Sequence, residues 1–252
     1  MKKILALLLA ALMLMSFVAC SDDNKEPEES GDGNHAQVEQ TATFEYEVVI
    51  GDNAIITKYN GSHDEHTVEV PSEIDGRKVV GIGDQAFYYN NAITAVTIPD
   101  TVKTIGNYAF AGCPLLASVT IPETVTSIGN YAFTNCSSLK EADLPTALTA
   151  IGEASFYGCS ALEAVELPAS VESIGNIAFW GCAKITSVEI PESVKSIGTQ
   201  AFYECSSLAS VKLTAGVESI GEFAFSKCAE EITFDAPADS YAAEYIANNY
   251  SK

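Results

Sequence analysis

Apolar residues recur along this chain with a fixed period of 23 residues, from Ile82 almost to the C-terminus. Seven successive units each carry a phenylalanine in the same place: Phe87, Phe110, Phe133, Phe156, Phe179, Phe202 and Phe225. In the same frame every unit has an Ile-Gly pair, first at Ile82-Gly83 and last at Ile220-Gly221. A period that holds over seven units predicts a repeat architecture.

Each unit combines a strand pattern with a turn pattern. Its consensus is roughly L-xx-V-x-I-P-xxx-V-xx-I-G-xx-A-F-xx-C-xx, and the alternation in V-x-I is that of a strand with one buried face. Proline ends this strand, and the spacing of apolar residues between the glycine and the cysteine predicts a short helical or 3₁₀ turn. Because one unit cannot bury its own apolar face, we expect stacked coils with a shared core and parallel β ladders.

This unit resembles the repeat of the bacterial leucine-rich-repeat proteins of the BspA-like type. The resemblance runs from about Phe44 to the C-terminus, with a lead-in at Tyr59-Asn60-Gly61, an opening coil at residues 70–76 and a closing segment at residues 241–246. It implies an α/β fold: a leucine-rich-repeat solenoid with parallel β ladders, short helical or 3₁₀ turns, a β cap at the N-terminus and a short helical cap at the C-terminus. Attachment to extracellular-matrix proteins is the role that the resemblance implies.

The array of about seven coils is predicted to occupy residues 82–237. Its two ends need caps, because an open coil exposes strand edges and core. Residues 43–81 alternate apolar and polar side chains and are predicted to form the N-terminal β cap and first coil. Residues 238–252 are predicted to form the C-terminal helical cap, with Asp239 or Ser240 as the helix N-cap.

The segment before the cap has the pattern of an export signal followed by a tether. Two lysines precede an apolar run from Ile4 to Val18, which has the length of a signal-peptide core and is too short to span a membrane. The run ends at Phe17-Val18-Ala19-Cys20, which resembles a bacterial lipobox. That resemblance implies removal of residues 1–19 and lipidation of Cys20, with an ordinary secretory signal as the alternative. Residues 20–42 are acidic and almost free of large apolar residues, which predicts a flexible tether.

The charge of the chain limits its partners. Asp and Glu number 34 against 13 Lys and Arg, for a net charge of −21. Such a protein repels a phosphate backbone, so we expect no binding to nucleic acid. We expect the protein in the cell envelope, surface-exposed and in contact with the membrane through its lipid anchor only.

The cysteine that recurs from Cys113 to Cys228, with Asn90 in the first unit, is the most conspicuous candidate for chemistry. Stacking would place these thiols in a straight file about 4.8 Å apart, whereas zinc needs four ligands at the corners of a tetrahedron. We expect buried free thiols, with disulfides between adjacent coils or a bound metal as the alternatives. In related leucine-rich repeats this position carries Asn or Cys that satisfies backbone groups at a bend.

Other motifs for chemistry are weak. His63 and His66 are expected in an exposed turn rather than in a metal site, and no phosphate-binding glycine loop or nucleophile elbow occurs. We therefore expect no cofactor, no metal and no enzymatic activity.

Outward-facing carboxylates form one candidate binding surface. The outward strand positions produce an acidic file with Asp143, Glu166 and Glu189 in one column and Glu141 in the column beside it. An open sheet has no pocket that would raise the pKa of one carboxyl, so we expect solvation or partner contact rather than catalysis.

Aromatic residues form the second candidate surface. The position after the core phenylalanine carries Tyr157, Trp180 and Tyr203 in three consecutive coils, around the chain's single tryptophan. Clustered aromatic residues are enriched at interfaces, with local packing against neighbouring turns as the alternative. We expect a monomeric, lipid-anchored interaction protein that adheres to a host or neighbouring-cell protein, with a glycan-binding accessory protein as the alternative function.

Overall fold

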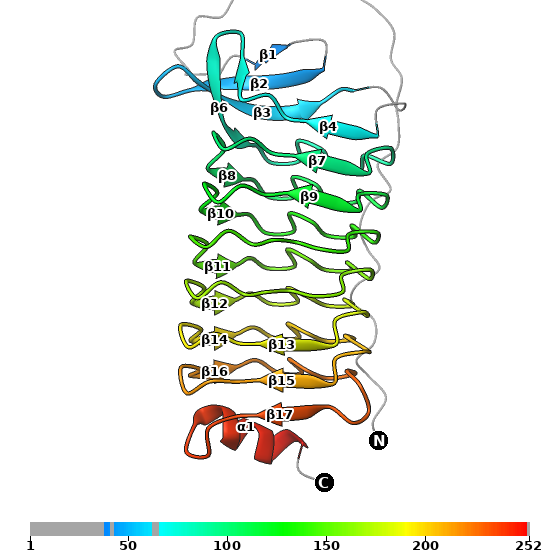
Figure 1. Ribbon diagram of the computed structural model, residues 1–252, viewed down its shortest axis with the longest axis vertical. Coiled ribbons are helices and arrows are strands. Elements are labelled where there is room, and N and C mark those ends of the chain that lie inside the picture. Colours follow the sequence, from blue (N-terminus) through cyan, green and yellow to red (C-terminus); the bar gives the residue numbers. More distant parts are fainter. Residues whose placement is uncertain (1–37, 41–42, 62–65, 251–252) are drawn as a thin grey trace, which may run out of the picture. The chain divides into compact units, whose positions relative to one another are not determined.

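The computed structural model describes residues 38–40, 43–61 and 66–250 (Figure 1). The described part is a stack of coils with a β cap at its N-terminal end and one helix at its C-terminal end. This arrangement confirms the predicted solenoid fold. The predicted signal peptide (1–19), the lipidation site Cys20 and His63 lie outside the described residues.

The N-terminal cap is a sheet made largely from two hairpins. Strand β2 (Phe44–Val49) pairs antiparallel with β1 (Val38–Gln40) and with β3 (Asn53–Tyr59). Strand β3 is parallel to β6 (Arg77–Ile82), which also forms a short hairpin with β5 (Glu73–Ile74). Because β6 pairs with the first short strand of the array, the cap sheet continues directly into the coils. The sequence pattern places residues 38–40 in the predicted tether, whereas the structure places them in this sheet.

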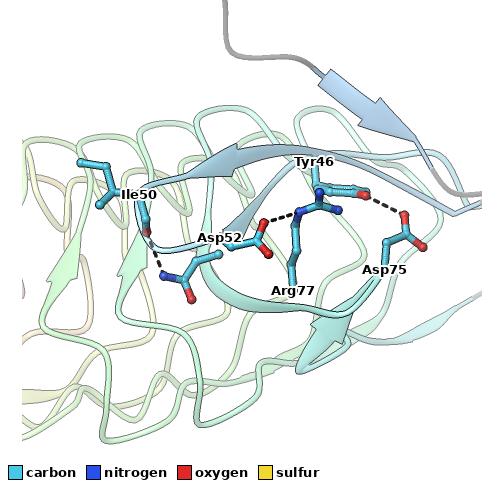
Figure 2. Close-up of polar contacts among 6 residues, drawn as sticks. Tyr46, Ile50, Asp52, Asp75 and Arg77 are labelled. Atoms are coloured by element: carbon cyan, nitrogen blue, oxygen red, sulfur yellow. Dashed lines mark hydrogen bonds and ion pairs between the residues drawn. The ribbon is translucent and has the colours of Figure 1, made fainter.

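Two polar contacts tie the turns of these hairpins to their neighbours. Arg77 of β6, the only arginine of the chain, places Nε 2.9 Å from Oδ1 of Asp52 in the β2–β3 turn (Figure 2). Tyr46 of β2 donates its hydroxyl to Asp75 in the β5–β6 turn at 2.6 Å. Both aspartates have positive φ, 56° for Asp52 and 50° for Asp75, a conformation that aspartate tolerates better than most residues. The two contacts therefore fix both turns of the cap.

The array carries two parallel ladders of short strands (Figure 1). The first uses the V-x-I segments, in β4 (Thr67–Glu69), β7 (Ala95–Thr97), β9 (Ser118–Thr120), β13 (Ser187–Glu189), β15 (Ser210–Lys212) and β17 (Thr233–Asp235). The second uses the residues that end at each isoleucine of the Ile-Gly pairs, in β8 (Thr104–Ile105), β10 (Ser127–Ile128), β11 (Ala150–Ile151), β12 (Ser173–Ile174), β14 (Ser196–Ile197) and β16 (Ser219–Ile220). Paired strands align equivalent positions of adjacent coils, such as Val188 with Val211.

Both ladders are interrupted near the middle of the array, contrary to the prediction of a strand in every coil. The first separates into β4-β7-β9 and β13-β15-β17, and the second separates between β10 and β11. Ala142 stands where β9 has Val119, so one coil lacks the branched core residue that favours a strand. In addition, Asp143 and Glu166 occupy equivalent positions of adjacent coils, where like charges oppose strand pairing.

The turn segment of each coil, from its glycine to its cysteine position, carries a hydrogen-bond ladder that crosses all six junctions of the seven coils. At the first junction three N–H groups donate to the next coil at 2.7 to 2.9 Å: Gln85 to Asn107, Phe87 to Ala109 and Tyr89 to Ala111. The intervening residues bond back within their own coil, as the Tyr88 N–H does to the Gln85 carbonyl at 3.0 Å. The i→i+3 bonds of the predicted helical or 3₁₀ turn thus occur at every second residue only, because the other N–H groups bond between coils.

This alternation requires positive φ twice in every coil. The second residue after the glycine and the second after the phenylalanine have φ between 48° and 61°, or between 69° and 73° where the residue is glycine. Glycine occupies such a position at Gly112, Gly158 and Gly181, but Ile177 does so at a φ of 48°. A bulky residue in this region costs about 1–3 kcal/mol of backbone strain, which the hydrogen bonds and packing of the stack must offset.

The core phenylalanines form one interior column. Their ring centroids are 4.7 to 5.4 Å apart from coil to coil, and each phenylalanine is at most 2% exposed. The column begins on Tyr59 of the cap, 5.1 Å from Phe87, and ends on Phe234 of β17, 5.5 Å from Phe225. Both caps therefore extend the aromatic packing of the array.

The repeated cysteine forms a hydrogen bond to the backbone of the preceding coil. Five of the six array thiols are buried and that of Cys228 is partly buried. Each Sγ donates to the carbonyl of the phenylalanine one coil earlier at 3.1 to 3.2 Å. Asn90, in the first unit, accepts hydrogen bonds from the N–H groups of Ala92 and Ile93 through its side-chain oxygen. Burial raises the pKa of the Cys159 thiol to about 12, so the neutral, donating form persists.

Helix α1 (Tyr241–Tyr250) closes the C-terminal end. Ser240 accepts a hydrogen bond from the Ala243 N–H through its Oγ at 3.1 Å, which is the predicted N-cap. Ala242 is fully buried, and the Tyr250 ring lies 4.7 Å from that of Phe234, tilted by 49°. The helix therefore covers apolar residues that the last coil would otherwise expose.

The glycine of the Ile-Gly pair permits close approach between the backbones of adjacent coils. This approach is less close at Gly152, where the second strand ladder is interrupted. A Cβ on Gly198 would lie 2.5 Å from backbone atoms of the preceding coil, whereas the nearest backbone atom at Gly152 is 3.2 Å away. We expect Gly198→Ala to lower the free energy of unfolding by about 3 kcal/mol and Gly152→Ala by about 1 kcal/mol. Urea denaturation of both variants checks this, and equal losses would contradict it.

The thiols offer a second test of the packing. At pH 8.5 we expect iodoacetamide to label Cys228 before the other array cysteines, because only Cys228 is partly exposed and the thiolate is the reactive form. Peptide mapping by mass spectrometry locates the label. The same experiment in denaturant is the control, in which all six array cysteines should react alike.

Candidate functional site

The three predicted aromatic residues meet on the turn side of the array. Tyr157 and Trp180 have ring centroids 5.7 Å apart, and Trp180 and Tyr203 have centroids 4.4 Å apart. The rings are tilted by 41° and 44°, and all three residues are partly exposed. We call Tyr157, Trp180 and Tyr203 the aromatic patch. It is a partly exposed apolar surface that spans three coils.

A carboxylate borders the aromatic patch. The indole Nε1–H of Trp180 donates to Oε2 of Glu204 at 3.2 Å, and the ammonium of Lys227 lies 2.8 Å from Oε1. Hydrogen bonds from Lys227 and Trp180 hold the pKa of Glu204 below its usual range, so this carboxyl is ionised at neutral pH. The patch therefore combines aromatic rings with a fixed negative charge.

The acidic file lies on the strand side, separate from the aromatic patch. Glu189 lies in β13 and pairs with Lys212 of β15 at 3.1 Å. Glu141, Asp143 and Glu166 lie in the two coils where the strand ladder is interrupted, and none has an ion-pair partner among the described residues. The two predicted surfaces thus do not combine into one site.

A second aromatic cluster lies toward the N-terminal end of the turn side. Tyr88 meets Tyr89 edge-on at 4.4 Å and Tyr108 edge-on at 6.2 Å, and Tyr108 stacks on Tyr131 at 4.7 Å. The Tyr131 hydroxyl donates to Glu153 at 2.6 Å, which raises the pKa of Tyr131 to about 12. The repeat pattern does not predict this cluster, because its members occupy three different columns of the repeat. One sequence signal for the cluster is that Tyr108 and Tyr131 occupy the same column, two residues after the glycine of the Ile-Gly pair.

Other features of the described residues do not suggest metal chemistry or a membrane span. No group of three or more His, Cys, Asp or Glu is arranged to hold a metal ion in that part of the chain. The Nδ1 of His66 lies 3.0 Å from the Ala92 carbonyl, in a contact within the protein. None of the described helices is long and apolar enough to cross a bilayer.

Comparison with known proteins agrees with this architecture. The family model "BspA type Leucine rich repeat region" matches residues 80–207 and 172–250, with six copies. A leucine rich cell surface protein from Faecalibacterium prausnitzii is 27% identical, with a TM-score of 0.57, over 81% of this chain and 77% of that one. The leucine rich repeat protein of T. pallidum is also 27% identical, with a TM-score of 0.49, over 81% of this chain and 87% of that one. No curated protein matches the chain.

The fold and the repeat define a leucine-rich-repeat solenoid, a fold that is typically non-enzymatic. More specifically, the chain belongs to the BspA-type leucine-rich-repeat family, whose model matches well over half of it.

Charge repulsion in the acidic file can be tested through stability. We expect Asp143→Asn or Glu166→Gln to raise the free energy of unfolding by a few tenths of a kcal/mol at low salt, because each removes one of two like charges at equivalent positions of adjacent coils. Urea denaturation at low and high salt measures the gain, which should shrink as salt screens the charges. Glu189→Gln is the matched control, since it removes the like charge next to Glu166 but also breaks the ion pair with Lys212, and should bring no net gain.

Proposed function

We propose that this protein is a surface-displayed interaction protein, anchored by a lipid on Cys20, that binds a protein of a host or neighbouring cell through the aromatic patch. The observation that carries the proposal is the contact of Tyr157, Trp180 and Tyr203 across three coils beside the ionised Glu204. Partly exposed tryptophan and tyrosine side chains are the residues that most often dominate binding energy at interfaces.

The rest of the fold supports a binding role. A solenoid spreads its outward residues over an extended surface, which suits recognition of a large partner better than enclosure of a small substrate. The F. prausnitzii relative is a cell surface protein, which agrees with display outside the cell. Neither the aromatic patch nor the acidic file forms an enclosed cleft, so we propose no catalytic activity.

Substitutions in the aromatic patch test the binding proposal. We expect Trp180→Ala and Tyr157→Ala each to weaken attachment to immobilised matrix proteins or host cells about tenfold, because each removes a central aromatic contact. Beads coated with purified protein provide the measurement. Tyr88→Ala, at the equivalent position of a coil outside the patch, is the matched control and should bind normally. Unchanged attachment by both patch variants would refute the proposal, and selective loss of signal on a glycan array would favour a glycan partner.

Display and anchoring need a separate test. We expect protease treatment of intact cells to remove the protein, and Cys20→Ser to shift it from the detergent phase to the aqueous phase. If Cys20→Ser leaves the phase unchanged, the lipid anchor is refuted but the binding surface is not.

A further inference from the structure

The end of the aromatic patch already holds a cation of the protein itself. The Lys227 ammonium lies 4.8 Å from the centroid of the Tyr203 ring and 2.8 Å from the Glu204 carboxylate. An aromatic face together with a carboxylate supplies both interactions that stabilise a bound ammonium or guanidinium. Lys227 therefore shows what kind of group this position accommodates.

The acceptor is held in place independently of Lys227. Glu204 receives the indole N–H of Trp180 on one carboxylate oxygen and Lys227 on the other. Trp180 packs in turn against Tyr203, with centroids 4.4 Å apart. The indole N–H of Trp180 therefore restrains the Glu204 carboxylate through an oxygen that Lys227 does not use.

Lys227 is weakly held and open to replacement. The lysine side chain is 60% exposed and that of Glu204 is 43% exposed, so solvent screens the ion pair. An arginine from a partner could bind Glu204 and also stack its planar guanidinium on the aromatic rings. The chain's net charge of −21 would attract a basic partner before contact.

We propose that Trp180, Tyr203 and Glu204 form a receptor for a basic side chain of the partner, and that Lys227 occupies this receptor until the partner displaces it. The proposal rests on the function proposed above and adds the chemistry of the partner, a protein segment with an exposed arginine or lysine. Lys227 then acts as an internal competitor.

An arginine-rich peptide is a suitable probe, with an acidic peptide of the same length as its control. Trp180 is the chain's only tryptophan, so intrinsic fluorescence of the full chain reports on this site during titration. We expect Lys227→Ala to tighten peptide binding about threefold, because the competitor is removed. We expect Glu204→Gln to weaken it about tenfold, because a charged hydrogen bond is lost.

A second ion pair supplies the matched controls. Lys212 and Glu189 lie 3.1 Å apart on the strand side, so Lys212→Ala and Glu189→Gln change the net charge by the same amounts without touching the receptor. Circular dichroism and thermal melts verify that every variant is folded. Equal effects of the strand-side and receptor variants would mean non-specific charge attraction and would overturn the proposal, as would weaker binding by Lys227→Ala.

The outcomes separate this inference from the proposed function. If Trp180→Ala impairs attachment to matrix proteins or cells while Glu204→Gln impairs neither attachment nor peptide binding, the aromatic patch binds a partner but does not recognise a basic group. If the peptide binds as predicted but attachment is insensitive to both variants, the receptor exists and the proposed adhesive function fails.

Discussion

The hydrogen-bond ladder on the turn side is the constraint on which the rest of the structure depends. Three N–H groups of each coil donate to the next coil at all six junctions, with distances of 2.7 to 3.0 Å, while both strand ladders are interrupted. Because alternate N–H groups must point along the stack, each coil needs two residues at positive φ. The same spacing stacks the phenylalanine rings and brings the backbone at each glycine into close approach. The turn-side ladder therefore determines how the coils stack, and the strands form where that stacking allows them to pair.

This ladder also has an electrostatic direction. Its carbonyls point toward the N-terminal cap and its N–H groups toward the C-terminal end, so the peptide dipoles add as they do in an α-helix. A β ladder lacks this property, because its peptide dipoles largely cancel. The N–H groups of Phe223, Phe225 and Lys227 lie at the positive end and donate to no acceptor among the described residues. Glu204, one coil away, is a carboxylate near that positive end, where a negative charge is favoured.

The sequence predicted those features that every coil repeats with one residue type. The stacked core could be predicted because the phenylalanine, the Ile-Gly pair and the cysteine each occupy the same environment in every coil. The start of the C-terminal helix could be predicted because Ser240 is a typical N-cap residue. The residues with positive φ could not be predicted from the sequence. Ile177 and Gln200 are not typical turn residues, and they take positive φ only because their N–H groups bond to the next coil. The aromatic patch was predictable from one column. The contact of Glu204 with Lys227 was not, because it joins two coils through a column in which glycine, asparagine and tyrosine also occur.

The division between uniform and variable columns explains where recognition can reside. Positions that hold the stack leave no freedom: the phenylalanine, glycine and cysteine side chains or backbones contact adjacent coils directly. The two positions after each phenylalanine bond to adjacent coils through their backbones, and their side chains differ from coil to coil, although the second position always has positive φ. Tyr157, Trp180, Tyr203 and Glu204 all stand at these positions. A binding surface can therefore change from coil to coil without disturbing the ladder that supports it.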